Sequence, residues 1–172
     1  VTSIGNKTFG YCTSLKDLRI EDGESTLSLG YNSSGTGEGL FYDCPLETLY
    51  LGRNLSYDTS SDGYSPFYDK STLKSVTIGN CVTSIGSSAF EGCSSLPEIN
   101  IPSNVASIGN YVFDGCTSLA IVTIAERETE LTLGSNGSEP MFADCPLNTV
   151  YIGGNINYPT SSSNGYSPFY RN

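Results

Sequence analysis

Histidine and tryptophan are absent from this chain of 172 residues, and methionine occurs only once. Without histidine, the Ser-His and Cys-His pairs that activate many enzymatic nucleophiles cannot form. The chain also has no Cys-x-x-Cys pair, which argues against a zinc site. Carboxylates are present, but scattered carboxylates are the ordinary expectation for an acidic surface. We therefore expect no enzymatic activity, no cofactor and no metal site.

Positive charge is scarce as well. The chain has 8 lysine and arginine residues against 18 aspartate and glutamate residues, which gives a net charge of −10. Binding to nucleic-acid phosphates or to anionic membranes requires clustered basic side chains, so we expect neither kind of partner. No apolar run is long enough to cross a membrane, and the N-terminus lacks the pattern of a signal peptide. We expect no direct membrane insertion.

The phenylalanines mark an internal repeat. All seven occupy one recurring position, at Phe9, Phe41, Phe67, Phe90, Phe113, Phe142 and Phe169. The gaps between them are 32, 26, 23, 23, 29 and 27 residues, which indicates a 23-residue unit that carries insertions elsewhere. Three residues after the phenylalanine stands cysteine in five copies, and Lys70 or Asn172 in the other two.

An apolar triplet with the spacing L-x-x-L-x-L follows the phenylalanine in six copies. The triplets are Leu15-Leu18-Ile20, Leu46-Leu49-Leu51, Leu73-Val76-Ile78, Leu96-Ile99-Ile101, Leu119-Val122-Ile124 and Leu147-Val150-Ile152. Three residues further on, four of the six copies have asparagine or cysteine. This is the pattern of leucine-rich repeats, and six copies in phase are strong evidence for it.

The pattern predicts a leucine-rich-repeat solenoid, a right-handed horseshoe of the α/β type. Each L-x-L segment gives a short strand, parallel to its neighbours at about 4.8 Å. Turns with short helical or 3-10 segments form the convex side. Since one unit cannot bury its apolar face alone, stacked coils place Phe on Phe and Leu on Leu. The recurring asparagine can bond backbone groups that the turning coil leaves unpaired.

Two central units show the repeat most clearly. Residues 82–96 read V-T-S-I-G-S-S-A-F-E-G-C-S-S-L, and residues 105–119 read V-A-S-I-G-N-Y-V-F-D-G-C-T-S-L. These units resemble BspA-like leucine-rich repeats, and the resemblance extends over essentially the whole chain. It implies a secreted or surface protein of bacteria, notably of Bacteroidetes, that adheres to host proteins or to other cells. The family has no shared catalytic residues, so the resemblance transfers no site.

A longer duplication overlies the repeat, because residues 24–70 resemble residues 128–172. We expect a single domain over residues 1–172 with about seven coils. The chain begins within a unit and neither end shows a polar capping repeat, which solenoids need for solubility. We expect a fragment of a longer array whose open ends can associate end to end.

The five cysteines that follow phenylalanines are expected to form a buried row. Neighbours in that row would have parallel side chains about 4.8 Å apart, whereas a disulfide needs Cβ atoms about 3.8 Å apart and converging side chains. A free cysteine behaves as a small apolar residue. The sixth, Cys81, stands at the asparagine position.

The concave sheet provides the first set of candidate binding residues. These are the outward positions inside each L-x-L segment, together with one nearby arginine: Arg19, Tyr50, Arg53, Thr77, Asn100, Thr123 and Tyr151. Solenoids commonly bind partners on this face, and tyrosine and arginine are favoured anchors of interfaces. A solvated sheet with incidental aromatic residues is the alternative.

Tyrosines in the inserted loops form a second candidate set: Tyr57, Tyr64, Tyr68, Tyr158, Tyr166 and Tyr170. They could present aromatic platforms, or they could plug the wider coils. The leading hypothesis is an extracellular or cell-surface adhesion module that binds a host or bacterial protein through the concave sheet and these loops. The alternatives are a glycan-binding module and a spacer that holds another domain off the cell surface.

Overall fold

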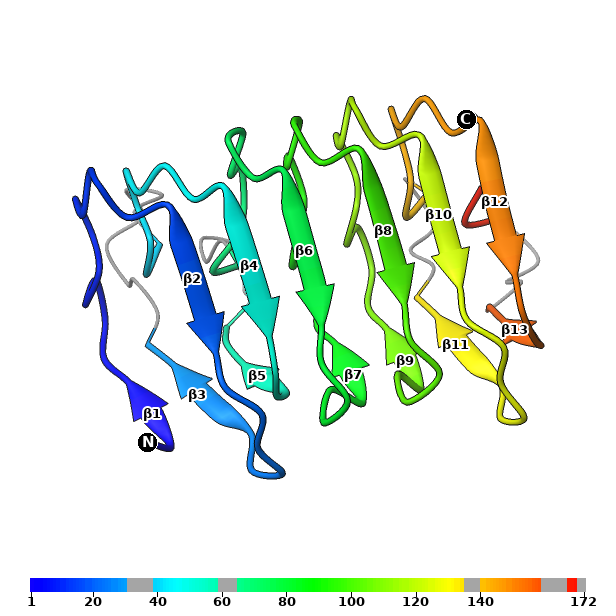
Figure 1. Ribbon diagram of the computed structural model, residues 1–172, viewed down its shortest axis with the longest axis horizontal. Coiled ribbons are helices and arrows are strands. Elements are labelled where there is room, and N and C mark those ends of the chain that lie inside the picture. The colour runs from blue at the N-terminus through cyan, green and yellow to red at the C-terminus, as the bar shows by residue number, and fades with distance from the viewer. Residues whose placement is uncertain (31–38, 59–64, 135–139, 159–166, 170–172) are drawn as a thin grey trace.

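The computed structural model describes residues 1–30, 39–58, 65–134, 140–158 and 167–169, and all strand pairing in it is parallel (Figure 1). One set of strands, which we call the front sheet, comprises β2 (Asp17–Ile20), β4 (Thr48–Leu51), β6 (Ser75–Ile78), β8 (Glu98–Ile101), β10 (Ile121–Ile124) and β12 (Thr149–Ile152). The other set, the side ladder, comprises β1 (Ser3–Ile4), β3 (Leu27–Leu29), β5 (Leu55–Ser56), β7 (Ser84–Ile85), β9 (Ser107–Ile108), β11 (Leu131–Leu133) and β13 (Ile156–Asn157). The two sets alternate along the chain, which confirms the predicted solenoid.

The predicted helical and 3-10 segments are absent from the described residues, which have only turns around each phenylalanine. Backbone conformation explains this correction. The second residue after the phenylalanine has a positive φ throughout the row, at Tyr11, Asp43, Asp69, Gly92, Gly115 and Asp144. Left-handed residues interrupt a right-handed helix, so the turn reverses before a helix can form. The same described residues contain no helix that could cross a membrane.

The phenylalanines stack as a continuous column through the core. Successive rings lie 5.1 to 5.8 Å apart between centroids, with their planes 5° to 15° from parallel. Phe67, Phe90 and Phe113 are fully buried. The ring spacing slightly exceeds the strand spacing of about 4.8 Å, so the column and the strands impose nearly the same period on the coils.

The cysteine row lies beside this column. Each thiol reaches back one coil and donates to the carbonyl of the preceding phenylalanine: Cys44 to Phe9 at 2.9 Å, Cys93 to Phe67 at 3.3 Å, Cys116 to Phe90 at 3.1 Å and Cys145 to Phe113 at 3.1 Å. All six cysteines are free, and these four are buried. Burial raises the pKa of the Cys93 thiol to about 12. The prediction of a buried row is therefore confirmed at four positions and wrong at Cys12, which is exposed.

The asparagine position also joins one coil to the next. The Asn104 amide donates to the carbonyls of Gly79 at 3.1 Å and Val82 at 2.5 Å. In the following coil Arg127 takes this position, and its guanidinium donates to Pro102 and Val105, which are the equivalent carbonyls. Asparagine and arginine thus satisfy the same pair of backbone groups, as predicted for the asparagine.

The two ladders are interrupted at successive junctions. The side ladder is continuous from β1 to β5 and again from β7 to β13, whereas the front sheet is continuous from β2 to β6 and again from β8 to β12. Between β5 and β7 the Asn54 side-chain oxygen accepts from the amides of Thr83 at 2.8 Å and Ser84 at 3.0 Å. Ladder pairing is therefore missing on the side face at one junction and on the front face at the next.

Truncation of a buried ring tests the importance of the phenylalanine column. We expect Phe113→Ala to lower the free energy of unfolding by about 3–5 kcal/mol, because it leaves a cavity that two flanking rings cannot fill. Phe113→Leu should cost less, and the exposed Ser75→Ala should stay within about 0.5 kcal/mol of the wild type. Urea unfolding monitored by circular dichroism measures all three. Equal losses for Phe113→Ala and Ser75→Ala would contradict the role of the column.

Candidate functional site

The outward side chains of the front sheet form a row across neighbouring strands. Residue pairing places Arg19 beside Tyr50 and Tyr50 beside Thr77 in one part of the sheet. In the other part, Thr123 lies between Asn100 and Tyr151. Six of the seven residues of the first candidate set therefore lie on one face, which we call the sheet face.

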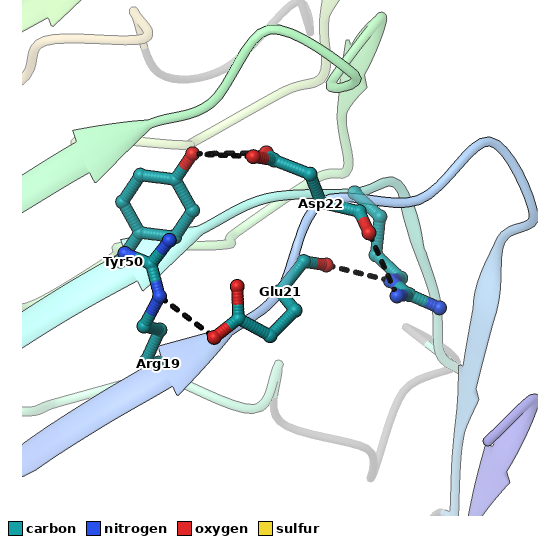
Figure 2. Close-up of polar contacts among 5 residues, drawn as sticks. Arg19, Glu21, Asp22 and Tyr50 are labelled. Carbon is teal, nitrogen blue, oxygen red and sulfur yellow. Dashed lines mark hydrogen bonds and ion pairs between the residues drawn. The ribbon is translucent and has the colours of Figure 1, made fainter.

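Arg19 and Tyr50 lie at the centre of a group of polar contacts on the sheet face (Figure 2). The Arg19 guanidinium carbon lies 3.8 Å from the centre of the Tyr50 ring, in cation–π geometry. The guanidinium also pairs with the Glu21 carboxylate at 2.9 Å. At the opposite end of the ring, the Tyr50 hydroxyl donates to the Asp22 carboxylate, with oxygen distances of 2.9 and 3.0 Å. The ring is therefore held by its face and by its hydroxyl.

The pKa shifts of Tyr50 and Arg19 are consistent with these contacts. The hydrogen bond to Asp22 raises the pKa of the Tyr50 hydroxyl, so Tyr50 stays a neutral phenol that can donate. The hydrogen bond to Glu21 raises the pKa of Arg19. Sequence reasoning missed both carboxylates because they follow β2 instead of lying inside an L-x-L segment. Gly79 was also missed: a Cβ there would lie 2.6 Å from the Asp22 carboxylate and 2.8 Å from the Tyr50 hydroxyl oxygen.

Arg53 is part of the same cluster but has a different role. Its guanidinium donates to the backbone carbonyls of Glu21 at 2.8 Å and Asp22 at 3.1 Å. It occupies the space above Gly23, where a Cβ would come within 2.5 Å of the guanidinium carbon. Arg53 thus fixes the turn that carries the two carboxylates, and its nitrogens face the backbone.

The second tyrosine of the row has a different environment from the first. Tyr151 is 62% exposed, whereas Tyr50 is half-buried. Tyr50 lies between Arg19 of β2 and Thr77 of β6, whereas Tyr151 has a paired neighbour, Thr123 of β10, on one side only, because β12 is the last described strand of the front sheet. Tyr151 therefore offers free aromatic surface, and Tyr50 offers a fixed ring edge.

A groove of about 440 Å³ crosses the sheet face between β6 and β8, and Thr77, Asn100 and Thr123 line it. It lies where the front sheet is interrupted. The residue after each front strand donates its amide to the preceding strand in four coils: Gly52 to Ile20, Gly79 to Leu51, Ala125 to Ile101 and Gly153 to Ile124. In the β8 coil that residue is Pro102, which has no amide hydrogen.

A second proline removes the donor at the other end of β8. The residue before the front strand donates at Glu47, Lys74, Ala120 and Asn148, but in β8 it is Pro97. Because proline cannot donate to a ladder, it is confined to sheet edges and strand ends, where no donor is needed. The two prolines therefore give β8 an edge that faces β6, and this edge forms the groove.

Basic side chains near the first end of the sheet face are already paired. The Glu47 carboxylate lies 2.8 Å from the Lys16 ammonium nitrogen and 2.7 Å from that of Lys74. These hydrogen bonds, first from Lys16 and then from Lys74, hold the pKa of Glu47 at about 2. With Arg19 also paired, the sheet face offers aromatic and hydrogen-bonding groups without a concentrated positive charge.

The loop tyrosines do not gather into one surface within the described residues. Tyr57 packs against the core and its hydroxyl donates to the Ser87 carbonyl at 3.0 Å. Burial raises the pKa of Tyr57. Tyr158 also packs against the core, and Tyr68 is half-buried. Tyr64, Tyr166 and Tyr170 lie outside the described residues.

No group of three or more potential metal ligands occurs in the described ranges. The structure thus assembles the sheet face from six candidate residues and adds Glu21, Asp22 and Gly79, which sequence reasoning missed. The sheet face can bind a partner through its tyrosine rings and its hydrogen-bonding side chains.

Comparison with known proteins gives two matches. The family described as BspA type leucine rich repeat region matches residues 1–62 and 37–167, in six copies. A solved leucine rich cell surface protein from Faecalibacterium prausnitzii A2-165 has a similar structure, with a TM-score of 0.55 and 20% sequence identity. The match covers 90% of this chain and 35% of that protein, so this chain spans little more than a third of its length. No curated protein sequence matches the chain.

The depressed pKa of Glu47 predicts a pH dependence. A carboxylate whose pKa falls on folding stabilises the fold above its unfolded value of 4.5, and this contribution is lost as the pH falls towards about 2. The difference in unfolding free energy between wild type and Glu47→Gln should therefore shrink over that range. NMR titration of the Glu47 carboxyl carbon gives the direct check, and a midpoint near 4.5 would show that the ion pairs do not persist in solution.

The proline explanation of the groove is tested by restoring the two donors. In a parallel ladder, alternate amides point to each neighbour; since Ile121 and Ala125 bond β8 from one side, the amides of Glu98 and Asn100 point towards β6. The double variant Pro97→Ala, Pro102→Gly should close the ladder and slow hydrogen exchange at Glu98 and Asn100.

The amides of Ile121 and Ala125, which already bond β8, should exchange at the wild-type rate and serve as the internal control. If Glu98 and Asn100 exchange as fast in the double variant as in the wild type, the prolines are not the cause of the interruption.

Proposed function

On the premise that the chain belongs to the BspA type leucine rich repeat family, we propose that it is a surface-exposed or secreted interaction module that binds a protein partner through the sheet face. The observation that carries the proposal is the fixed Tyr50 ring, held by Arg19 on its face and by Asp22 at its hydroxyl. Adhesion of a bacterial cell through this module is the finer form of the proposal.

Preorganisation makes Tyr50 a suitable anchor. Binding costs about 0.5–1.5 kcal/mol for each flexible side chain that becomes immobilised, and Tyr50 has largely met this cost in the free protein. The Arg19 guanidinium covers one face of the Tyr50 ring, so the pair presents a fixed ring edge beside the carboxylates of Glu21 and Asp22. Tyrosine and arginine are enriched among the residues that dominate interface energies.

The distance between the two tyrosines sets the size of the partner surface. Tyr50 on β4 and Tyr151 on β12 are separated by β6, β8 and β10, hence by four strand spacings, or at least roughly 19 Å, since the unpaired step from β6 to β8 is wider than a paired one. A single helix laid along the row, or an extended segment of about six residues at 3.3 Å each, matches this length. The groove between β6 and β8 lies between the two tyrosines and can admit a side chain of the partner.

The kind of partner follows from the charges of the face. Lys16, Arg19 and Lys74 are each paired with a carboxylate, so the face does not select strongly anionic ligands. We propose that the partner presents a polar protein surface with aromatic or hydrogen-bonding groups. A location at the cell surface is supported by the description of the structural neighbour as a cell surface protein.

A binding screen with tyrosine variants tests the proposal. The chain is passed over arrayed extracellular-matrix proteins and polysaccharides, and each hit is measured with Tyr50→Ala and Tyr151→Ala. A dominant anchor contributes about 2 kcal/mol or more, so we expect Tyr50→Ala to weaken binding by about 30-fold.

Tyr11→Ala is the matched control, because Tyr11 is 60% exposed like Tyr151 but belongs to a turn, away from the sheet face. It should leave affinity unchanged. If a protein partner binds both the Tyr50→Ala variant and the Tyr151→Ala variant as tightly as the wild type, the sheet-face site is refuted. Hits on polysaccharides alone would replace the proposal with glycan binding, and a silent screen would favour the spacer.

A further inference from the structure

A cavity of about 600 Å³ opens at the turns, between the coil that contains Phe41 and the coil that contains Phe67. Its walls include Tyr42, Asp43 and Cys44 of one turn and Tyr68, Asp69 and Lys70 of the next. It lies on the phenylalanine side of the coils and is separate from the sheet face.

The cavity coincides with a break in the cysteine row. Lys70 stands where the other described turns carry cysteine, so this coil has no thiol to donate to the preceding phenylalanine carbonyl. A second series of bonds joins the turns from backbone amide to backbone carbonyl: Tyr11 to Tyr42, Asp69 to Glu91, Gly92 to Asp114 and Gly115 to Ala143. The Thr72 hydroxyl still donates to the Leu46 carbonyl across these two coils at 2.7 Å, but the side chain of Lys70 has replaced a small buried group of the cysteine row.

Lys70 differs from the other lysines in its surroundings. It is half-buried, and burial lowers its pKa, an effect partly opposed by the neighbouring thiols of Cys44 and Cys93 and by Asp69 and Asp43. The chain contains only three other lysines, at positions 7, 16 and 74. Glu47 raises the pKa of Lys16 and forms an ion pair with Lys74. Lys70 thus combines a cavity with an amine that is more readily neutral.

We propose that Lys70 is a nucleophilic amine that condenses reversibly with a small aldehyde admitted to the cavity. The neutral nitrogen adds its lone pair to the carbonyl carbon, the carbonyl oxygen leaves as water with two protons, and a C=N bond remains. Amine and aldehyde become imine and water, so the step needs no oxidant or reductant, and hydrolysis reverses it.

The walls of the cavity indicate which aldehydes fit. The rings of Tyr42 and Tyr68 provide flat apolar surface, and the carboxylates of Asp43 and Asp69 can accept hydrogen bonds from hydroxyl groups. The shared chemistry is an aldehyde on a small hydroxylated or aromatic body. The open-chain form of a sugar and an aromatic aldehyde are two sources that the experiment separates.

Reductive trapping tests the proposal. The chain is incubated near pH 7 with cyanoborohydride and either glyceraldehyde or benzaldehyde, and the modified lysine is located by peptide mass spectrometry. Each unit by which the pKa of an amine falls gives about tenfold more neutral amine near neutral pH. Among the lysine side chains we therefore expect the first adduct at Lys70, ahead of Lys16 and Lys74, with this preference fading above pH 10 as all lysine amines become neutral. Adducts at the exposed α-amine of Val1 are counted separately, because an α-amine is largely neutral at about pH 8.

Labelling of Lys70 by only one of the two aldehydes identifies the source and supports the proposal. If Lys7, Lys16 and Lys74 react first with both aldehydes, as their exposure alone would dictate, the proposal is overturned.

Two variants complete the test. Lys70→Cys restores the residue of the row and removes the amine, so it should fold and lose the fast adduct. Lys74→Gln removes a lysine outside the cavity and should keep the adduct at Lys70. A fast first lysine adduct that survives in Lys70→Cys would place the reactive side-chain amine elsewhere and refute the proposal.

Discussion

The structure depends on one constraint, which is that equivalent residues of successive coils must lie directly above one another. The phenylalanine column shows this most clearly, because its rings remain within 15° of parallel along the whole row. Since the spacing between ring centroids is close to the spacing between strands, stacked aromatic rings and parallel strands can share one axis. Any residue that joins two coils, such as the Cys93 thiol or the Asn104 amide, must then reach a backbone group of the adjacent coil. The repeated sequence pattern is the consequence.

Insertions and prolines disturb this stacking in different ways. Insertions lengthen the loops and leave the ladder bonds in place, whereas Pro97 and Pro102 remove the donors that would bind β8 to β6. The junction before it opens on the other face, where Asn54 bridges β5 and β7. Because the openings are on different faces, each coil still has one complete ladder at every junction. The solenoid can therefore contain a groove in the sheet face without breaking apart.

The period of the repeat predicts which residues stack on one another. The helix content, the exposure of Cys12 and the contact of Asp22 depend on the local backbone and on neighbours in space, which the repeat does not specify. The triplets, the phenylalanine column and the row of outward residues follow directly from the repeat. The missing helices could have been anticipated only from the left-handed residues beside each phenylalanine, and Tyr11 or Asp69 gives no such signal in the sequence alone. The exposure of Cys12 depends on its place in the first turn. Asp22 belongs to the site through its contact with a tyrosine 28 residues away, and a single sequence does not record such a distance in space.

The same reasoning explains why the two matched tyrosines are not equivalent. The duplication repeats the backbone of the coil, so Tyr50 and Tyr151 take the same position on their strands. It does not repeat the neighbours, because Thr123 stands where Arg19 would be needed. The arginines follow this rule too: Arg53 fills the space above Gly23, whereas in the second copy Arg127 lies against Gly154. A duplicated solenoid therefore keeps its core by repetition and acquires different surfaces by substitution at outward positions. The candidate site and the Lys70 cavity both lie where a residue departs from the repeat, which is where binding can differ between otherwise equal coils.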